Sequence, residues 1–388
     1  MFDIDIIIPC YGKSELINKG IASIAFQWRR EFIHVTLVND CSPNTDCDYQ
    51  NLIDRYKSEI DIRCIRTPRN VGQGLARQYG IDHTDCNYFM FMDEDDMLGN
   101  HLAVSMFCGA VEAASFIHND DGSIRMDGDG HPLNNKDAKP VAIASAPLFV
   151  FDEQTSYTIE SSNHVWVNSK LYSRAFLDRH SIRFNEAQSR HAEDYYFTEC
   201  FFFCLDNDPE YQGILMDNGT LFYLWYPNVE SQSRRDPEYG YMLSGYTMDG
   251  SVNVIRYMQD SASHLEWTEN TKEQYRLKLL NMTMYSYFTF LSFIKHVQTT
   301  GYVPEPEDWY ILQKACNALR EMLYSDWDRY TYTERIENYF VVKNHTDVKF
   351  TEPWVSFSDY ICTGCKELKW SIEELLQSKD RRNKIWED

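Results

Sequence analysis

The stretch Tyr88-Phe-Met-Phe-Met-Asp93-Glu94-Asp95-Asp96 joins an apolar run to four consecutive acidic residues. A short apolar run that ends in acids is typical of a buried strand whose end reaches solvent. Carboxylates packed this closely repel one another unless a proton or a cation intervenes. Hard divalent cations such as Mg²⁺ and Mn²⁺ bind oxygen ligands of this kind. The alternative interpretation is an ordinary acidic loop after a buried strand, and the stretch alone does not decide between the two.

Strand and helix patterns alternate through the first hundred residues. Before the acidic stretch, the sequence predicts strands at Ile4–Ile8, Ile33–Val38 and Ile62–Ile65 and helices at Leu16–Trp28, Leu52–Tyr56 and Gly72–His83. Such alternation implies βαβ units and a mostly parallel central sheet flanked by helices. Ligands of such sheets bind at the carboxyl ends of the strands.

The length of 388 residues predicts more than one domain, because a single core usually stops growing at about 250–300 residues. Beyond the first hundred residues the sequence predicts further strands at Val141–Phe151, His164–Leu171 and Leu221–Tyr226, and from about Ser251 long amphipathic helices. We therefore expect an α/β domain over residues 1–250 and a helical domain over residues 251–388.

Charge and composition exclude several classes of protein. The chain has 37 Lys and Arg against 59 Asp and Glu, a net charge of −22, which argues against sequence-independent binding of nucleic acid or of an anionic membrane. The least polar stretch, Leu279–Ile294, includes the polar residues Asn281, Thr283, Ser286 and Ser292 and is shorter than the ~20 apolar residues of a membrane span. We therefore expect no integral membrane segment. The odd number of cysteines, 11, in a chain of this length predicts reduced thiols in a cytoplasmic protein.

Four further segments, together with the acidic stretch, resemble the family 2 inverting glycosyltransferases of the A-type (Rossmann-like) fold. In chain order the five are Ile6-Ile-Ile-Pro-Cys-Tyr11, Val35-Thr-Leu-Val-Asn-Asp40-Cys-Ser42, Asn70-Val-Gly72-Gln-Gly-Leu-Ala-Arg77, Asp93-x-Asp95-Asp96, and Glu193-Asp194 at the start of a predicted helix. The resemblance covers about residues 3–235, and the ordered set is far more specific than any member. It implies a UDP-sugar donor, a divalent metal (Mn²⁺ or Mg²⁺) and transfer by direct displacement to an acceptor hydroxyl.

The resemblance also implies roles for individual residues. Pro9 and Tyr11 would line the nucleotide base, with the Tyr11 ring stacked on it, and Asp40 would accept a hydrogen bond from the uracil imide. Arg77 would lie near the nucleotide and its diphosphate. Two departures from the family pattern are Gly12, where the family usually has Asn, and Asn39, which replaces the first of two acids.

The remaining implied roles concern the metal and the chemistry. Asp93 and Asp95 match the metal-binding Asp-x-Asp, with Asp95 the direct ligand, and Asp96 would contact the donor sugar. Asp194 matches the catalytic base. His191 and His164 are candidates for a third metal ligand. A structural alternative for Glu193-Asp194 is that acids in a first helical turn stabilise the helix dipole.

Two other functions remain open at this point. A non-catalytic, metal-dependent sugar-binding protein could use Asp93–Asp96 or Asp127-Gly-Asp-Gly as oxygen ligands. A dinucleotide-dependent oxidoreductase is suggested by Gly72-x-Gly74-x-x-Arg77, although the third glycine of that fingerprint is absent. For a glycosyltransferase, the acceptor would be a glycan, another polymer, a protein or a modified nucleobase. We expect the helical domain to bind the acceptor or to form a homo-oligomer.

Overall fold

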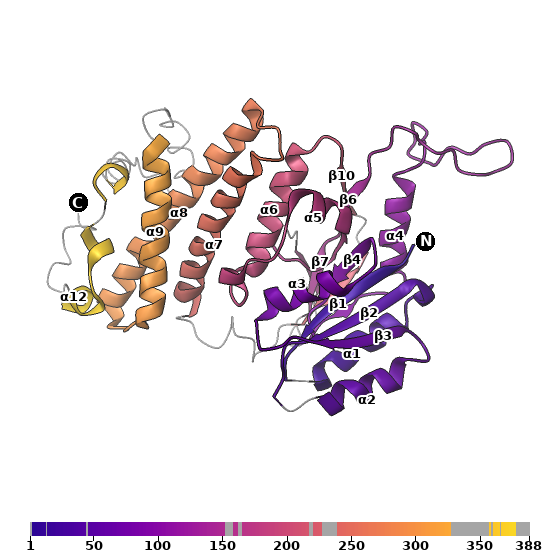
Figure 1. The fold of residues 1–388 in the computed structure, drawn as a ribbon, viewed down its shortest axis with the longest axis horizontal. Coiled ribbons are helices and arrows are strands. Elements are labelled where there is room, and N and C mark those ends of the chain that lie inside the picture. Colours follow the sequence, from indigo (N-terminus) through magenta and orange to yellow (C-terminus); the bar gives the residue numbers. More distant parts are fainter. Residues whose placement is uncertain are drawn as a thin grey trace. The chain divides into compact units, whose positions relative to one another are not determined.

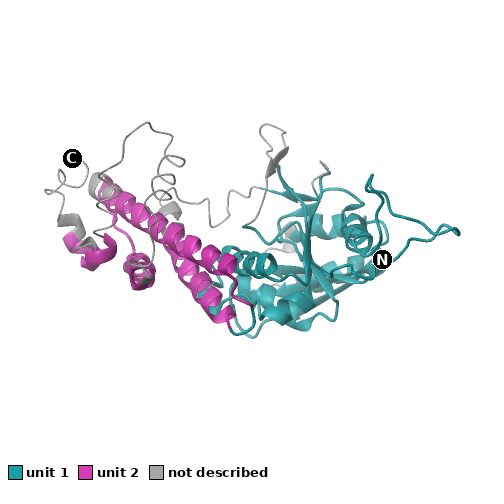
Figure 2. Ribbon diagram, turned by 90° about the horizontal axis from the view of Figure 1, so that it is seen from above, with its two compact units in different colours: residues 1–231, 263–265 teal, residues 232–262, 266–388 magenta. Residues whose placement is uncertain are grey.

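The structure is a computed structural model that describes residues 2–12, 14–43, 46–151, 158–161, 165–216, 220–226, 239–326, 357, 360–364 and 366–377. The chain divides into two compact units (Figure 2). Unit 1 comprises Met1–Ser231 and Ser263–Leu265, and unit 2 comprises Gln232–Ala262 and Glu266–Asp388. The predicted division at residue 250 falls inside helix α7 (Tyr239–Ser261).

Unit 1 is built on a seven-stranded sheet with the strand order β10-β6-β9-β4-β1-β2-β3 (Figure 1). The strands are β1 (Ile4–Cys10), β2 (Ile33–Asn39), β3 (Asp61–Arg66), β4 (Tyr88–Phe91), β6 (Val141–Ser145), β9 (Lys170–Ser173) and β10 (Gln212–Leu215). All neighbouring pairs are parallel except the two pairs that β9 makes, with β4 and with β6. The predicted mostly parallel sheet is thus confirmed.

Strand β1 lies inside this sheet, between β4 and β2. Ile4 is aligned with Ile33 of β2 and with Tyr88 of β4. Strands that are covered on both faces have continuous apolar sequences, and the buried run Ile6–Ile8 fits this pattern. The helices of unit 1 are α1 (Ser14–Ala25), α2 (Asp46–Tyr56), α3 (Gln73–His83), α4 (Ala103–Ala113), α5 (Arg174–His180) and α6 (Glu193–Asn207). At Gly80 of α3, a Cβ atom would lie 2.3 Å from Cγ2 of Ile7, so this helix packs directly on β1.

A smaller sheet with the order β5-β11-β7-β8 completes unit 1. Its strands are β5 (Met97–Leu98), β7 (Leu148–Phe151), β8 (Thr158–Ser161) and β11 (Tyr223–Trp225). The single strand predicted over Val141–Phe151 is wrong, because the chain leaves the main sheet after β6 and enters the smaller one at β7. Pro147, which has no N–H to donate to a strand ladder, lies at this break. Strand β5 comes directly after the acidic turn in sequence, and β11 pairs with β5 in the antiparallel direction.

Unit 2 is helical, as predicted. Its long helices α7, α8 (Glu269–Thr300) and α9 (Pro306–Asp326) pack against one another, and the short helix α12 (Ile372–Gln377) follows. Aromatic residues of α8 and α9, including Phe290, Phe293 and Trp309, are buried in its core. Among the helices that the structure describes, none has the length and apolar character needed to cross a membrane.

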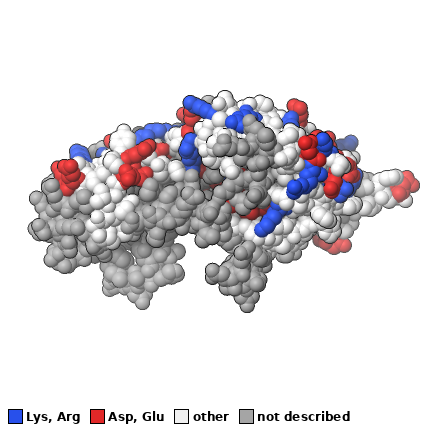
Figure 3. All heavy atoms as spheres, turned by 90° about the horizontal axis from the view of Figure 1, so that it is seen from below, with Lys and Arg blue, Asp and Glu red and all other residues white. Residues whose placement is uncertain are grey.

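Charged side chains of the described residues are mixed in sign over the face seen in Figure 3. Acidic and basic groups lie beside one another there, rather than in separate patches of one sign. Exposed ion pairs among the described residues include Lys57 with Asp54 and Arg183 with Asp82. Pairs of this kind contribute little to stability.

Candidate active site

The ends of four adjacent parallel strands form one edge of the main sheet. Hydrogen bonds continue past the strand ends: Asp40 N–H donates to Cys10 O at 2.9 Å, and Thr67 N–H donates to Asn39 O at 3.0 Å. Met92 N–H donates to Ile7 O at 3.2 Å. These bonds fix the residues that follow β1, β2, β3 and β4 side by side. The predicted site residues after these strands are thereby brought to one edge of the sheet.

Arg77 of helix α3 joins three carboxylates at this edge. Its side chain is 1% exposed. Nη2 donates to Asp93 Oδ1 at 2.7 Å, and Nη1 donates to Asp194 Oδ1 at 2.9 Å and to Glu193 Oε1 at 3.1 Å. The acidic turn after β4 and the first turn of α6 are therefore held together by one guanidinium, although they are about a hundred residues apart in sequence.

The excess of negative charge in this cluster perturbs the ionisation of its members. Burial would lower the pKa of Arg77, but the charges of Asp194, Asp93 and Glu193 outweigh it and raise that pKa. Burial, and then the Asp194 charge, raises the pKa of Glu193 to about 8. Burial also raises the pKa of Asp194, against the lowering effect of Arg77. A buried carboxylate with a raised pKa is a stronger base than an exposed one.

The segment before β9 supports the same carboxylates from the other side. Because β9 runs antiparallel, the residues that precede it lie at the edge where the parallel strands end. Asn168 Nδ2 donates to Asp93 Oδ2 at 2.9 Å, and Val167 N–H donates to Asp194 Oδ2 at 3.4 Å. Lys170 Nζ donates to Trp166 O at 2.6 Å and to Asn168 O at 3.3 Å. The buried Lys170 therefore holds the backbone of this segment in place through these two hydrogen bonds.

Lys170 itself has an unusual ionisation. Burial lowers its pKa to about 7, and the nearby Asp194 charge opposes this shift. Sequence analysis missed both Asn168 and Lys170. They lie at the end of the predicted strand His164–Leu171, where a single amide and a single amine give no signal of a site. His164 lies outside the described residues, and the described strand begins only at Lys170.

The acidic turn is anchored to the smaller sheet through Asp96. This residue is 0% exposed; Tyr223 Oη donates to its Oδ2 at 2.6 Å, and Tyr226 N–H donates to its Oδ1 at 3.0 Å. Burial raises the pKa of Asp96 well above its usual range. Tyr223 Oη also accepts a hydrogen bond from Asp93 N–H at 3.1 Å. Asp96 and Tyr223 together hold the backbone of the turn, and sequence analysis did not single out Tyr223.

Asp93 and Asp95 are half-buried residues of this turn. Glu94 between them connects the turn to the end of β1, because its Oε2 accepts a hydrogen bond from Tyr11 N–H at 3.1 Å. Each carboxylate oxygen of Asp93 accepts one hydrogen bond, from Arg77 and from Asn168. A carboxylate oxygen has about two acceptor positions, so Asp93 keeps the capacity to bind a cation. Hard divalent ions suit this all-oxygen donor set.

The ends of β1 and β2 hold the residues assigned to the nucleotide. The ring of Tyr11 is 50% exposed, and Pro9 at the end of β1 is half-buried. Asp40 is buried; its Oδ1 accepts from Thr67 Oγ1 at 2.9 Å and Val71 N–H at 2.8 Å, and its Oδ2 accepts from Gly72 N–H at 2.8 Å. Asp40 therefore fixes the start of the glycine segment in this structure.

Gly72, directly before α3, and Gly74, in its first turn, allow a close approach of the chain to α6. Gly72 has φ 86°, and a Cβ there would lie 2.6 Å from Ser189 O. A Cβ at Gly74 would lie 2.9 Å from Cβ of Glu193. Gly74 N–H donates to Ser189 O at 2.8 Å, so the N–H groups of both glycines already have partners. This segment packs α3 against the start of α6, and its donors are not presented to a dinucleotide phosphate.

Two further features of unit 1 are a histidine close to the cluster in sequence and a hollow at the other edge of the sheet. His191 is half-buried two residues before Glu193, and burial, followed by the charge of Arg190, lowers its pKa. A hollow of about 710 Å³ lies at the opposite edge of the sheet, lined by residues that include Asp5, His34 and Arg63. These residues precede or begin the strands, so this hollow is separate from the carboxylates at the carboxyl edge.

Comparisons with known proteins agree with this architecture. Residues 5–106 match the model of glycosyl transferase family 2. An uncharacterized glycosyltransferase of Haemophilus influenzae is 32% identical over 98 residues, which are 25% of this chain and 38% of that protein. The teichoic acid poly(glycerol phosphate) polymerase of Staphylococcus epidermidis is 31% identical over 103 residues, 26% of this chain and 14% of that protein. The matched region thus spans less than half the length of either relative.

The solved structure of S. aureus TarS residues 1–349 in complex with UDP-GlcNAc has a similar fold. Its TM-score is 0.54 at 16% identity, and the alignment covers 84% of this chain and 83% of that one. Unit 1 therefore has the A-type glycosyltransferase fold. The match to the model of glycosyl transferase family 2 over residues 5–106 lies within this unit, and over those residues it agrees with the resemblance noted in the sequence.

Proposed function

We propose that this chain is a metal-dependent inverting glycosyltransferase that moves a sugar from a UDP-sugar to an acceptor hydroxyl by direct displacement. The observation that carries the proposal is the bridge from Asp93 through Arg77 to Asp194 at the carboxyl edge of a family 2 domain. It joins the acids suited to a metal and a diphosphate to the acid suited to be a base. Such a reaction needs these two groups of acids at one site.

The donor would bind across the ends of β1, β2 and β4. The half-exposed Tyr11 ring offers a face on which a nucleobase can stack, with Pro9 beside it. Asp40 would accept from the uracil imide in addition to the donors it already holds. TarS, which has the same fold, was solved with UDP-GlcNAc, and this is why we place a UDP-sugar first among the donors.

Asp93 and Asp95 would hold Mn²⁺ or Mg²⁺, with Asp96 near the donor sugar. When bound, the ion would neutralise the charge that develops on the departing diphosphate. Arg77 is buried behind Asp93, with both terminal nitrogens bonded to carboxylates. We therefore assign to Arg77 a positioning role together with a long-range charge effect on the diphosphate. His191 is the candidate for a third ligand that lies among the described residues.

Asp194 would take the proton from the acceptor hydroxyl. Arg77 and Val167 N–H hold its two oxygens in one orientation, and its raised pKa increases its strength as a base. Direct displacement needs no covalent intermediate, so no nucleophilic Ser or Cys is required. The stereochemical outcome is inversion at the anomeric carbon, because the base and the leaving group act on opposite faces of the sugar.

An aromatic surface next to Asp194 supports a saccharide acceptor. Trp166, 36% exposed, directly precedes Val167, and its ring lies 5.6 Å from that of Trp225. Flat aromatic faces offer a large contact area at low conformational cost, which suits the apolar face of a sugar ring. We therefore place a glycan or another hydroxyl-bearing polymer before a modified nucleobase. For unit 2 we propose acceptor binding or oligomerisation.

The test is a panel of nucleotide-sugars incubated with the protein and Mn²⁺ or Mg²⁺, with release of nucleoside diphosphate as the readout. We expect release from a UDP-sugar, dependent on metal and lost in Asp95→Asn and in Asp194→Asn. The anomeric configuration of the product, measured by NMR, tests inversion. Sugar binding without release of diphosphate from any donor would instead favour a non-catalytic sugar-binding protein and contradict the proposal.

A further inference from the structure

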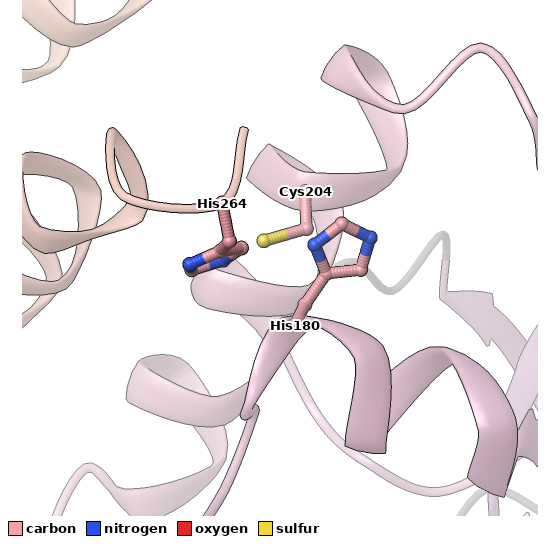
Figure 4. A group of neighbouring side chains, drawn as sticks. All are labelled: His180, Cys204 and His264. Carbon is pink, nitrogen blue, oxygen red and sulfur yellow. The ribbon is translucent and has the colours of Figure 1, made fainter. Parts of the chain in front are cut away.

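Three side chains with metal-binding atoms come together in unit 1, away from the carboxylate cluster. They are His180 at the end of α5, Cys204 in α6 and His264 in the segment 263–265 (Figure 4). One ligand atom from each lies within 4.8 Å of the other two. Figure 4 shows the sulfur of Cys204 between the two imidazole rings, whose centroids are 5.6 Å apart.

The spacing of these atoms is close to that of a tetrahedral metal site. Bonds of about 2.0–2.1 Å to nitrogen and about 2.3 Å to sulfur put the ligand atoms of zinc about 3.4–3.6 Å apart. The observed limit of 4.8 Å therefore needs a contraction of about 1 Å. His264 is exposed on a connecting segment, so a side-chain rotation there can supply it. His180 and Cys204 are buried on two helices and provide a fixed half of the site.

The surroundings of His180 match those of a metal-binding histidine. Its Nε2 is 2.9 Å from Asp208 Oδ2, and both side chains are almost completely buried. Arg179 Nε lies 2.9 Å from the same carboxylate oxygen and fixes it. A carboxylate on one ring nitrogen orients the imidazole and makes the other nitrogen a better ligand.

We propose that His180, Cys204 and His264 bind a zinc ion. Two imidazoles and one thiolate form a nitrogen and sulfur set that suits Zn²⁺ and does not suit Mg²⁺, which prefers oxygen ligands. The proposed site is therefore chemically distinct from the all-oxygen site at Asp93 and Asp95. With three protein ligands and His264 at the surface, water would occupy the fourth position.

The zinc ion would attach the segment 263–265 to the helices of unit 1. This segment connects α7 to α8, and only Ser263–Leu265 of that connection belongs to unit 1. His264 would be held to α5 and α6 by coordination, in addition to the packing of Leu265, which is buried. The role we assign to the ion is structural, so its loss should lower stability without removing a reacting group.

The experiment uses the full chain in the background of Asp95→Asn, which removes a ligand of the other proposed metal site. After removal of metal by a chelator, Zn²⁺ is titrated in the presence of a phosphine reductant, and Co²⁺ is used as the spectroscopic probe. We expect one tight equivalent of Zn²⁺ per chain, a rise in the thermal unfolding midpoint, and a thiolate-to-cobalt charge-transfer band.

Two variants and one control locate the ion. In His264→Ala, zinc affinity should fall by more than the 10–100-fold that typically follows loss of a residue hydrogen-bonded to a metal ligand. Because His264 is exposed, this substitution should leave the fold intact. In Cys204→Ser, the charge-transfer band should vanish. His131→Ala, a change at an exposed histidine in the segment before β6, should bind as the parent does. Equal zinc affinity in His264→Ala and its parent, or a band that persists in Cys204→Ser, would overturn the proposal.

Discussion

Arg77 Nη1 donates to Asp194 Oδ1 at 2.9 Å, so the proposed base is bound to a guanidinium that is buried beneath it. The same guanidinium binds Asp93 through its other terminal nitrogen. A shift of either carboxylate is therefore transmitted to the other through one rigid, planar group. The acid that would deprotonate the acceptor and the acid that would bind the metal are positioned by the same side chain.

Replacement of Arg77 by Met should destabilise unit 1 strongly. It leaves Asp93, Glu193 and Asp194 without their cation, and removal of one partner of a buried ion pair typically costs about 3–5 kcal/mol. The decrease in the free energy of unfolding should be larger at pH 9 than at pH 5, because protonation of the carboxylates at the lower pH relieves their repulsion. Urea unfolding at both pH values measures it. Arg77→Lys should recover only part of the loss, since one ammonium cannot make the forked contact; full recovery would contradict this account.

The pH dependence of activity should reflect the raised pKa of Asp194. Transfer needs this carboxylate ionised, so kcat/KM falls as the pH drops through its pKa, at a higher pH than for an ordinary aspartate. The ammonium of Lys170 lowers the pKa of Asp194. Lys170→Met should therefore move the acid limb to higher pH. The pH profile of kcat/KM measures the shift, and the exposed Lys136→Met is the control; a shift to lower pH would exclude this charge effect.

Tyr223→Phe should loosen the acidic turn. The change removes one hydroxyl that donates to Asp96 and accepts from Asp93 N–H. Leaving buried polar groups without partners costs about 1–3 kcal/mol, and the metal affinity of the turn should fall with it. Thermal unfolding and Mn²⁺ titration measure the two effects. Tyr310→Phe, at a side chain that is 64% exposed, should change stability by less than about 0.5 kcal/mol; equal effects in both variants would contradict the role of Tyr223.

Two glycine substitutions test the packing of α3 on β1. In Gly80→Ala, the added Cβ would lie 2.3 Å from Ile7 Cγ2, and overpacking of this kind costs about 1–3 kcal/mol. Gly109 lies in α4, where an added Cβ meets nothing within 4 Å. Gly109→Ala should therefore stabilise by about 0.5–1 kcal/mol. Denaturant unfolding of both variants gives the comparison, and a neutral Gly80→Ala would mean that α3 can move away from β1.

Trp166→Ala tests the aromatic surface next to the proposed base. If an acceptor sugar packs on this ring, the KM for acceptor should rise roughly 3- to 10-fold, which corresponds to the aromatic contribution of about 0.5–1.5 kcal/mol. The KM for donor should stay the same, because Tyr11 and Asp40 lie after other strands. Steady-state kinetics with each substrate varied in turn separate the two effects. Phe26 is an exposed aromatic residue directly after α1. Phe26→Ala is therefore the control for loss of an exposed aromatic side chain.

Local patterns in the sequence predict the main sheet and the edge where its site lies. Each predicted strand among the first hundred residues is rich in apolar residues, although Asp5, Thr36 and Arg63 interrupt three of them. Parallel strands buried on both faces have largely apolar sequences. The acids after β4 were predicted as site residues because they follow a strand directly and match the family pattern, whereas those at the start of α6 were predicted from the resemblance alone. Their meeting through Arg77 is a property of the fold, since α3 and α6 are distant in sequence.

Other features depend on contacts that leave no local signal. Asn168 and Lys170 reach the site because β9 is reversed, and a reversed strand has no distinct sequence pattern when it is buried. Tyr223 lies on β11 of the smaller sheet, and its hydroxyl donates a hydrogen bond to Asp96. The ligands proposed for zinc lie 24 and 60 residues apart in sequence, far from the short spacings by which such sites are found. The break at Pro147 was missed because the residues on both sides of it are apolar.

The reversed strand β9 also gives unit 1 a second way to bring side chains to the same edge of the main sheet. Parallel strands contribute the segments that follow them, whereas β9 contributes the segment that precedes it. The acidic turn follows a strand of the first kind, whereas the exposed residues Val165 and Trp166 belong to the segment before β9. In the proposed reaction, substitution at Val165 or Trp166 can therefore alter which acceptor is taken while Asp93 and Asp194 stay in place. Acceptor preference can then diverge without a compensating change in the residues proposed to bind the donor.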